Sequence, residues 1–169
     1  MTVARVLVAY ATKYGSTKEV AQAVGDALGA RGLEVDVRPA RDVKTLEGYS
    51  AVVLGVALYF FRWHSDGRKF LARYRKALSA LPFAVFGLGP IEDKAEQFDG
   101  ARTHLDKGMA KAPSVVPKAM AVFGGAVDPA NLRFPDNNPA FKAMPASDLR
   151  DWDAIRAWAG GLPEALGLA

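Results

Sequence analysis

The sequence predicts a single α/β domain with a parallel sheet that helices cover on both faces. Two observations support this fold class. Apolar runs of strand length alternate with segments of helical periodicity five times along the 169 residues, which is the order expected of strand–helix–strand units. The run at 51–57, AVVLGVA, has no alternating polar residue, as in a strand that is buried on both faces. We expect the domain to span residues 1–169.

Five segments are predicted as strands. Residues 34–38 alternate valine with charged side chains, which is typical of a half-exposed strand. Gly89-Pro90 ends the fourth segment and Gly124-Gly125 ends the fifth, since these residue types favour turns. The predicted strands are residues 6–10, 34–38, 51–57, 83–88 and 119–123.

Helical patterns fill the intervals between the strands. Helices are predicted over residues 16–31, 66–80, about 103–111 and from 151 onward, with a short turn or helix at 42–47. Gly160-Gly161 and Pro163 interrupt the last pattern. The only long irregular piece, residues 125–148, contains four prolines. Loops of that length inside compact domains are usually functional or mobile.

The composition limits the chemistry. The absence of cysteine excludes disulfides, thiol redox chemistry, cysteine nucleophiles and cysteine-rich zinc sites. Any redox chemistry must therefore come from a bound cofactor. No histidine or carboxylate cluster has metal-ligand spacing, and no hydrolase serine elbow is present. We expect neither a metal site nor a catalytic nucleophile.

The charge pattern bears on partners and location. The net charge of +4 is mild and scattered, so we expect no nucleic-acid partner, whereas acidic small molecules or an anionic membrane surface are compatible. The N-terminal apolar run is too short to span a bilayer and is interrupted by Arg5, so we interpret it as a strand and not a signal peptide. We expect a cytoplasmic protein with at most peripheral contact to the inner face of the membrane.

The turn after the first predicted strand, TKYGST at 12–17, gathers hydroxyl groups around a glycine. Ligands of open parallel sheets bind at the carboxyl ends of the strands. Gly15 allows close backbone approach, and the N-terminus of the following helix favours an anion. Thr12, Ser16 and Thr17 supply hydroxyl donors, so the turn predicts a phosphate cradle. The alternative is that Ser16 or Thr17 merely caps the helix, for which one hydroxyl would suffice.

The motif residues that this turn lacks indicate which class of phosphate ligand would bind. The turn lacks the first glycine and the Gly-Lys pair of a nucleotide-triphosphate loop. A dinucleotide fingerprint begins at Gly87 and Gly89, but Glu92 stands at the position of its third glycine. A hydroxyl-rich turn without a magnesium-pairing lysine suits a terminal monophosphate.

Residues 12–17 resemble the FMN-phosphate loop of the flavodoxin superfamily. Residues 55–59, GVALY, and 86–90, FGLGP, resemble the two loops that contact the flavin ring in that superfamily. The resemblance implies a flavodoxin-like three-layer sandwich with a five-stranded parallel sheet in the order 2-1-3-4-5, and FMN as cofactor. The cofactor-binding residues that it implies are Thr12, Lys13, Tyr14, Gly15, Ser16, Thr17, Ala57, Leu58, Tyr59, Gly87, Leu88, Gly89 and Pro90.

Two further stretches, FGGAVDP at 123–129 and RDWDAI at 150–155, resemble the branch that contains the menaquinone-dependent protoporphyrinogen IX oxidases. This implies two-electron oxidation of a small, porphyrinogen-like substrate with transfer to a quinone. The sequence departs from the pattern at several positions. Tyr14 replaces a phosphate-binding threonine, Val56 a common serine and Phe60-Phe61 a common glycine, and residues 131–146 are shorter and richer in proline.

Two other functions share this fold, namely an electron carrier of the flavodoxin type and an NAD(P)H:quinone reductase. Typical carriers are strongly acidic, whereas this chain is basic. Lys13 or Arg62 near the flavin would stabilise its reduced anion. The balance of charge therefore favours the enzyme, with the flavin cycling between its oxidised and fully reduced forms.

The segment after the third predicted strand offers further candidates. Stacking on the flavin or substrate is expected of at least one member of the aromatic cluster, and packing on the core is the alternative. The cations there form either a solvated surface or a basic rim for substrate carboxylates. The aromatic residues are Tyr59, Phe60, Phe61 and Trp63, and the cationic ones are Arg62, His64 and Arg68.

Overall fold

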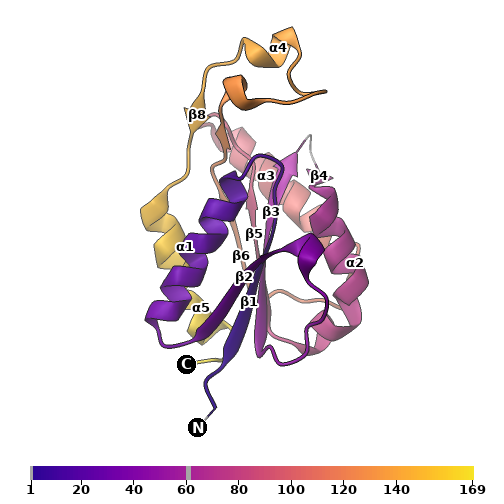
Figure 1. Ribbon diagram of the computed structural model, residues 1–169, viewed down its shortest axis with the longest axis vertical. Helices are drawn as coiled ribbons and strands as arrows, with labels where there is room; N and C mark the ends of the chain where they lie inside the picture. Colours follow the sequence, from indigo (N-terminus) through magenta and orange to yellow (C-terminus); the bar gives the residue numbers. More distant parts are fainter. Residues whose placement is uncertain (1, 60–61) are drawn as a thin grey trace.

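The computed structural model describes residues 2–59 and 62–169, and Figure 1 shows their arrangement. The side chain of Tyr59 also lies outside the described part of the chain. The strands are β1 (Arg5–Ala11), β2 (Glu34–Pro39), β3 (Ala51–Tyr59), β4 (Arg62–Trp63), β5 (Phe83–Leu88), β6 (Ala119–Phe123), β7 (Ala126–Val127) and β8 (Ser147–Asp148). The α-helices are α1 (Ser16–Ala30), α2 (Ser65–Ala80), α3 (Ala95–Met109), α4 (Pro139–Lys142) and α5 (Trp152–Ala165), and the 3-10 helices are η1 (Ala40–Asp42) and η2 (Pro129–Asn131).

The central sheet confirms the predicted topology. Among the described residues, five parallel strands follow the order β2-β1-β3-β5-β6. These are the five predicted strands in the order 2-1-3-4-5. The short β4 pairs antiparallel with the end of β3. The strand order reverses between β1 and β3, so the expected ligand site lies at the carboxyl ends of these two strands.

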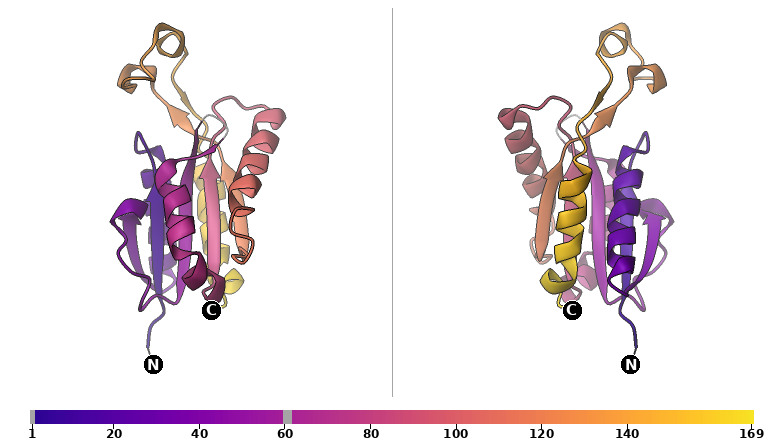
Figure 2. Two further views of the ribbon diagram at one scale, coloured as in Figure 1. Left: turned by 90° about the vertical axis from the view of Figure 1, so that its right-hand side faces the viewer. Right: turned by 90° about the vertical axis from the view of Figure 1, so that its left-hand side faces the viewer.

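Helices cover both faces of this sheet (Figure 2). Helices α2 and α3 pack on one face through Phe70, Leu71 and Leu105, among others. Helices α1 and α5 pack on the other face through Val24, Ile155 and further apolar residues. Strands β1, β3 and β5 are buried over nearly their whole length because both layers cover them. Trp158 packs edge-on against Phe86 and Phe123.

Three predicted boundaries were wrong. Helix α3 begins at Ala95 and not near residue 103, because its first turns are mostly polar and exposed and carry no apolar period. Strand β3 continues two residues beyond 57 to form the pair with β4. The short turn predicted at 42–47 is offset, because a 3-10 turn spans Ala40–Asp42 and a second turn lies at 47–48. Pro163 lies inside α5 without ending it.

Residues 126–148, which we call the arch, rise from the carboxyl-end edge of the sheet, well beyond the other loops (Figures 1 and 2). The arch contains β7, η2, α4 and β8, and β7 pairs with β8 at its base. Gly125 fixes the base because its N–H donates to the Pro90 carbonyl at 2.6 Å and its carbonyl accepts from the Leu149 N–H at 2.9 Å. The irregular segment predicted from the sequence is thus an ordered excursion. None of the described helices is long and apolar enough to cross a membrane.

Candidate functional site

The phosphate loop, residues 12–17, leads from β1 into α1. Gly15 adopts φ +94°, a left-handed backbone conformation that residues other than glycine rarely adopt. The Gly15 N–H donates to Thr12 Oγ1 at 3.0 Å, which closes the turn. Helix α1 then begins at Ser16, and the N–H groups of its first turn point out of the helix toward the loop. The loop therefore presents backbone donors at a helix N-terminus.

Thr17 carries an unused donor beneath this loop. The residue is fully buried, and its Oγ1 atom has no hydrogen-bond partner among the described residues. Burying a hydroxyl without a partner costs free energy, so native structures rarely do so without a reason. An anion held at the start of α1 would supply the missing acceptor. This orphaned hydroxyl fits a bound phosphate group.

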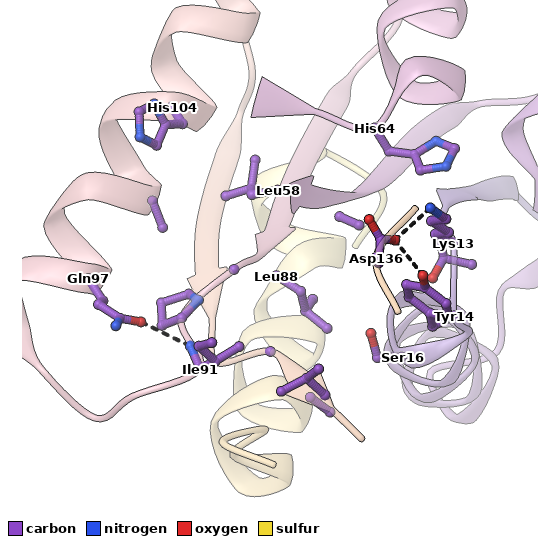
Figure 3. A pocket seen from close by; sticks show the side chains of 18 of the residues that line it. Lys13, Tyr14, Ser16, Leu58, His64, Leu88, Ile91, Gln97, His104 and Asp136 are labelled. Carbon is purple, nitrogen blue, oxygen red and sulfur yellow. Dashed lines mark hydrogen bonds and ion pairs between the residues drawn. The ribbon is translucent and has the colours of Figure 1, made fainter. Parts of the chain in front are cut away.

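A cavity of about 520 Å³ adjoins the loop (Figure 3). Its walls come from the phosphate loop, the ends of β3 and β5, the first half of α3, and the arch. Volumes of this size suit small-molecule or cofactor sites. The lining residues are Thr12, Lys13, Tyr14, Ser16, Ala57, Leu58, His64, Leu88, Gly89, Pro90, Ile91, Glu96, Gln97, Gly100, Ala101, His104, Gly125, Ala126, Val127, Leu132, Asp136, Phe141 and Met144.

Asp136, which descends from the arch, is the acidic group nearest the phosphate loop in Figure 3. Its side chain is buried, and its Oδ2 atom accepts a hydrogen bond from Lys13 Nζ at 2.6 Å and another from the Tyr14 hydroxyl. The hydrogen bond to Asp136 raises the pKa of Lys13 above its ordinary value. Lys13 is therefore a charged residue that is already paired.

His64 lies beside this pair, on the same side of the cavity as Lys13 (Figure 3). It caps α2, because its Nδ1 atom accepts a hydrogen bond from the Asp66 N–H at 3.1 Å. Burial lowers the pKa of His64 below 6.5, although the Asp66 carboxylate opposes that shift. The imidazole is thus neutral near pH 7, with its proton on Nε2.

The comparison with known families identifies the family of this chain. A family model described as a flavodoxin domain matches residues 7–139. The chain belongs to the flavodoxin domain family. FMN is the cofactor of this family, as predicted from the sequence. The left-handed Gly15 and the unpaired Thr17 hydroxyl fit its phosphate group.

Proteins similar to this flavodoxin domain include an enzyme and several flavodoxins. Protoporphyrinogen IX dehydrogenase (quinone) of Escherichia coli is 23% identical over 133 residues, which cover 78% of this chain and 71% of that protein. A flavodoxin structure from Pseudomonas aeruginosa superposes with a TM-score of 0.60 at 17% identity and covers 96% of this chain and 99% of its own. A short-chain flavodoxin associated with a bacterial microcompartment gives 0.62 at 18% identity, over 99% and 100% of the two chains. At such identities, these two structures show the fold alone.

The fold of this flavodoxin domain brings most of the predicted cofactor residues together. Those that line the cavity are Thr12, Lys13, Tyr14, Ser16, Ala57, Leu58, Leu88, Gly89 and Pro90. Gly15 and Thr17 support the loop from beneath without lining the cavity. The predicted roles of Tyr59, Phe60 and Phe61 concern side chains that lie outside the described residues. Contact of each residue with FMN stays a prediction.

Gly87 and Gly89 also accommodate a neighbouring side chain. A Cβ on Gly87 would lie 2.9 Å from Leu58 Cδ1, and one on Gly89 would lie 3.3 Å from Leu58 Cβ. Both glycines therefore make room for the Leu58 side chain. Gly87 does not line the cavity, and Leu58 instead forms the wall there.

The segment after β3 also required correction. Trp63 is buried in the core against α3, so it follows the core-packing alternative and does not face the cavity. Arg62 is exposed, and neither Arg62 nor Arg68 lines the cavity. Arg62 thus follows the solvated-surface alternative, and with a neutral His64 these residues do not form the alternative basic rim at the cavity. The spacing of these residues gave no information on which way each side chain points.

Proposed function

We propose that this chain is an FMN-dependent oxidoreductase that removes two electrons from a small, porphyrinogen-like organic substrate and transfers them to a quinone. The observation that carries the proposal is the cavity of about 520 Å³ beside the phosphate loop, walled in part by the arch. A carrier that docks onto protein partners needs an exposed flavin edge, whereas here Leu132, Phe141 and Met144 of the arch add an apolar wall to the cavity that FMN would occupy. Apolar surface beside the cofactor suits a small organic substrate. The similarity to protoporphyrinogen IX dehydrogenase (quinone) supports this choice.

The chain's own residues would bind and orient the cofactor. The Thr17 hydroxyl, Ser16 and the first N–H groups of α1 would hold the phosphate, and the loops around Leu58 and Gly89 would border the ring. Bound FMN would supply the redox chemistry, taking a hydride equivalent from the substrate and passing electrons to the quinone. Leu58, Leu88 and Ile91 line the cavity with apolar surface, which would keep water away from the reacting groups.

His64 is our candidate for the hydrogen-bond donor to a quinone oxygen. Its Nδ1 is fixed by the Asp66 N–H, so Nε2–H is the available donor of the neutral imidazole. The side chain lines the cavity. We propose that Nε2–H donates a hydrogen bond to the quinone oxygen and keeps its proton, while the protons that the quinone takes up on reduction come from solvent.

Substrate recognition would rest mainly on apolar contact. Among the described lining residues, the cationic side chain is Lys13, and Asp136 already pairs with it. Carboxylates of a porphyrinogen would therefore extend out of the cavity toward solvent while its ring system enters. A quinone partner would bring the protein to a membrane surface, and the net charge of +4 is compatible with anionic lipids there.

A coupled assay tests the proposal. The FMN-loaded protein is mixed anaerobically with protoporphyrinogen IX and menadione, and porphyrin fluorescence is recorded. We expect fluorescence to rise only when both FMN and menadione are present, with menadiol formed in proportion. Porphyrin formation no faster than in the FMN-free control would contradict the proposed reaction. Efficient menadione reduction by NADPH alone would instead indicate the reductase.

A further inference from the structure

We propose that Asp136 is a positioning residue that fastens the arch to the phosphate loop and thereby holds the FMN cavity closed. This inference rests on FMN binding by this family and is independent of the proposed substrate. It concerns a residue in the segment where sequence patterns indicated only an irregular, proline-rich loop.

The contact joins segments that are far apart in the sequence. Asp136 lies 123 residues after Lys13 and 122 after Tyr14, and its Oδ2 accepts from both. Only 3% of Asp136 is exposed. A carboxylate is rarely buried to this extent unless it is paired, because desolvation disfavours its charge. Here an ammonium group and a phenol together compensate for that cost.

Arg133 contacts the same two loop residues. Its guanidinium donates to the Lys13 carbonyl at 2.7 Å and lies 5.2 Å from the centre of the Tyr14 ring. The Asp136 N–H donates to the Arg133 carbonyl at 2.7 Å, so residues 133–136 form a turn that places both side chains. The Lys13-Tyr14 dipeptide is thus contacted by both Arg133 and Asp136.

The contact with Asp136 also accounts for the presence of Tyr14 in the loop. Flavodoxin-type loops resemble residues 12–17 but usually have a threonine at the position of Tyr14. A threonine hydroxyl is too close to the backbone to extend far from the loop, whereas the phenol here reaches Asp136. Position 14 therefore offers no hydroxyl to the phosphate, and its phenol instead holds the arch.

Closure of the arch matters because the arch forms one wall of the cavity. Leu132, Phe141 and Met144 line the cavity from this segment. Both ends of the arch are anchored independently of Asp136. Gly125 bonds to Pro90 and Leu149, and Arg150 donates to Glu19 at 3.1 Å and to Asp148 at 2.7 Å. Loss of the Asp136 contact would therefore loosen the arch over the cavity, with only the Arg133 contacts left to hold it to the loop, while its base stays in place.

The test compares two variants with a matched control. Asp136→Asn removes the charge, and Tyr14→Phe removes only the phenol oxygen. Asp128→Asn is the control, because Asp128 is an exposed acid of the same arch whose side chain accepts hydrogen bonds from its neighbours Ala130 and Asn131. Dissociation rates of FMN and of riboflavin, and iodide quenching of bound-flavin fluorescence, are measured for each protein.

We expect Asp136→Asn to release FMN and riboflavin at least tenfold faster and to raise iodide quenching, with a smaller change of the same sign in Tyr14→Phe. The double variant should fall short of the sum of the single effects, because both remove one shared contact. Asp128→Asn should behave as the wild type.

Three results would overturn the proposal. Unchanged or slower FMN release by Asp136→Asn would mean that the carboxylate mainly repels the phosphate. An effect on FMN without one on riboflavin would confine Asp136 to the phosphate loop and remove its role in closure. If Asp136→Asn fails to fold, unchanged flavin release and quenching in Tyr14→Phe would be decisive against it. None of these results depends on turnover, so they are separate from failure of the proposed reaction.

Discussion

The Thr12 hydroxyl accepts a hydrogen bond from the Gly15 N–H at 3.0 Å. This bond is internal to the phosphate loop and closes it before any ligand binds. Five residues after Thr12, the buried Thr17 hydroxyl has no partner among the described residues. The two threonines are therefore inequivalent, although the sequence presents them as equal phosphate donors.

Thr17→Val should weaken FMN binding without destabilising the FMN-free protein. A hydrogen bond to a charged group contributes roughly 1.5–3 kcal/mol, so FMN affinity should fall by about one to two orders of magnitude. The free energy of unfolding without FMN should stay the same or rise, since valine removes an unsatisfied buried hydroxyl. Flavin titration and urea denaturation measure the two quantities.

Thr12→Val is the matched comparison, because it breaks the loop-closing bond and should destabilise the FMN-free protein. Equal loss of unfolding free energy in both variants would show that the Thr17 hydroxyl is satisfied within the protein and not reserved for phosphate.

His64 should make stability depend on pH below about 6.5. Burial lowers its pKa in the folded protein, so the unfolded chain takes up a proton first as the pH falls. Unfolding free energy therefore decreases through this window, by at most about 1.4 kcal/mol per pH unit for one proton. His64→Asn keeps an acceptor for the Asp66 N–H, since asparagine is a favoured cap, but it cannot titrate.

Urea denaturation between pH 7 and pH 5 measures this contribution. The wild type should lose stability more steeply than His64→Asn as the pH falls. Parallel curves would mean that the folded protein binds the proton as readily as the unfolded chain.

Gly108→Ala should destabilise the protein, although alanine usually stabilises a helix interior. A Cβ at Gly108 would lie 2.1 Å from Trp63 Nε1. The buried indole leaves no room, and overpacking of this kind costs about 1–3 kcal/mol. Gly100→Ala on the same helix is the control, because nothing lies within 4 Å of its Cβ, and it should gain up to about 1 kcal/mol. A gain in both variants, measured by denaturation, would show that Trp63 does not occupy the core beside α3.

The fold could be predicted because its signals are local or repeat regularly. Strands β1, β3 and β5 are buried on both faces, so their sequences are continuous apolar runs. Gly15 indicated the turn before α1, because the left-handed backbone conformation at that position favours glycine. The start of α3 at Ala95 was missed, since buried Ala101, Leu105 and Met109 give a period only to its second half.

The site was predicted less completely because side-chain direction and distant contacts leave no periodic signal. Asp136 stands in a proline-rich segment without regular pattern, and its partners lie more than 120 residues earlier. One clue was available, namely the tyrosine in place of a hydroxyl residue at position 14. Gly87 and Gly89 were recognised as special, but only the position of Leu58 shows what their missing side chains accommodate.

The central claim is that a small organic substrate reacts inside the cavity. Gly100 lines the cavity from α3, and a Cβ there meets nothing within 4 Å, so Gly100→Phe places a ring in that space without a backbone clash. Gly161 on α5 is equally open but does not line the cavity, which makes Gly161→Phe the control.

The decisive measurement is the rate of menadione-coupled porphyrinogen oxidation per bound FMN in these two variants. Ferricyanide reduction by the dithionite-reduced proteins serves as a reference reaction that needs no cavity. We expect Gly100→Phe to lower kcat/KM at least tenfold while its ferricyanide rate, and both rates of Gly161→Phe, match the wild type. Equal kcat/KM in the two variants and the wild type would contradict the account and assign the chain to the electron carriers.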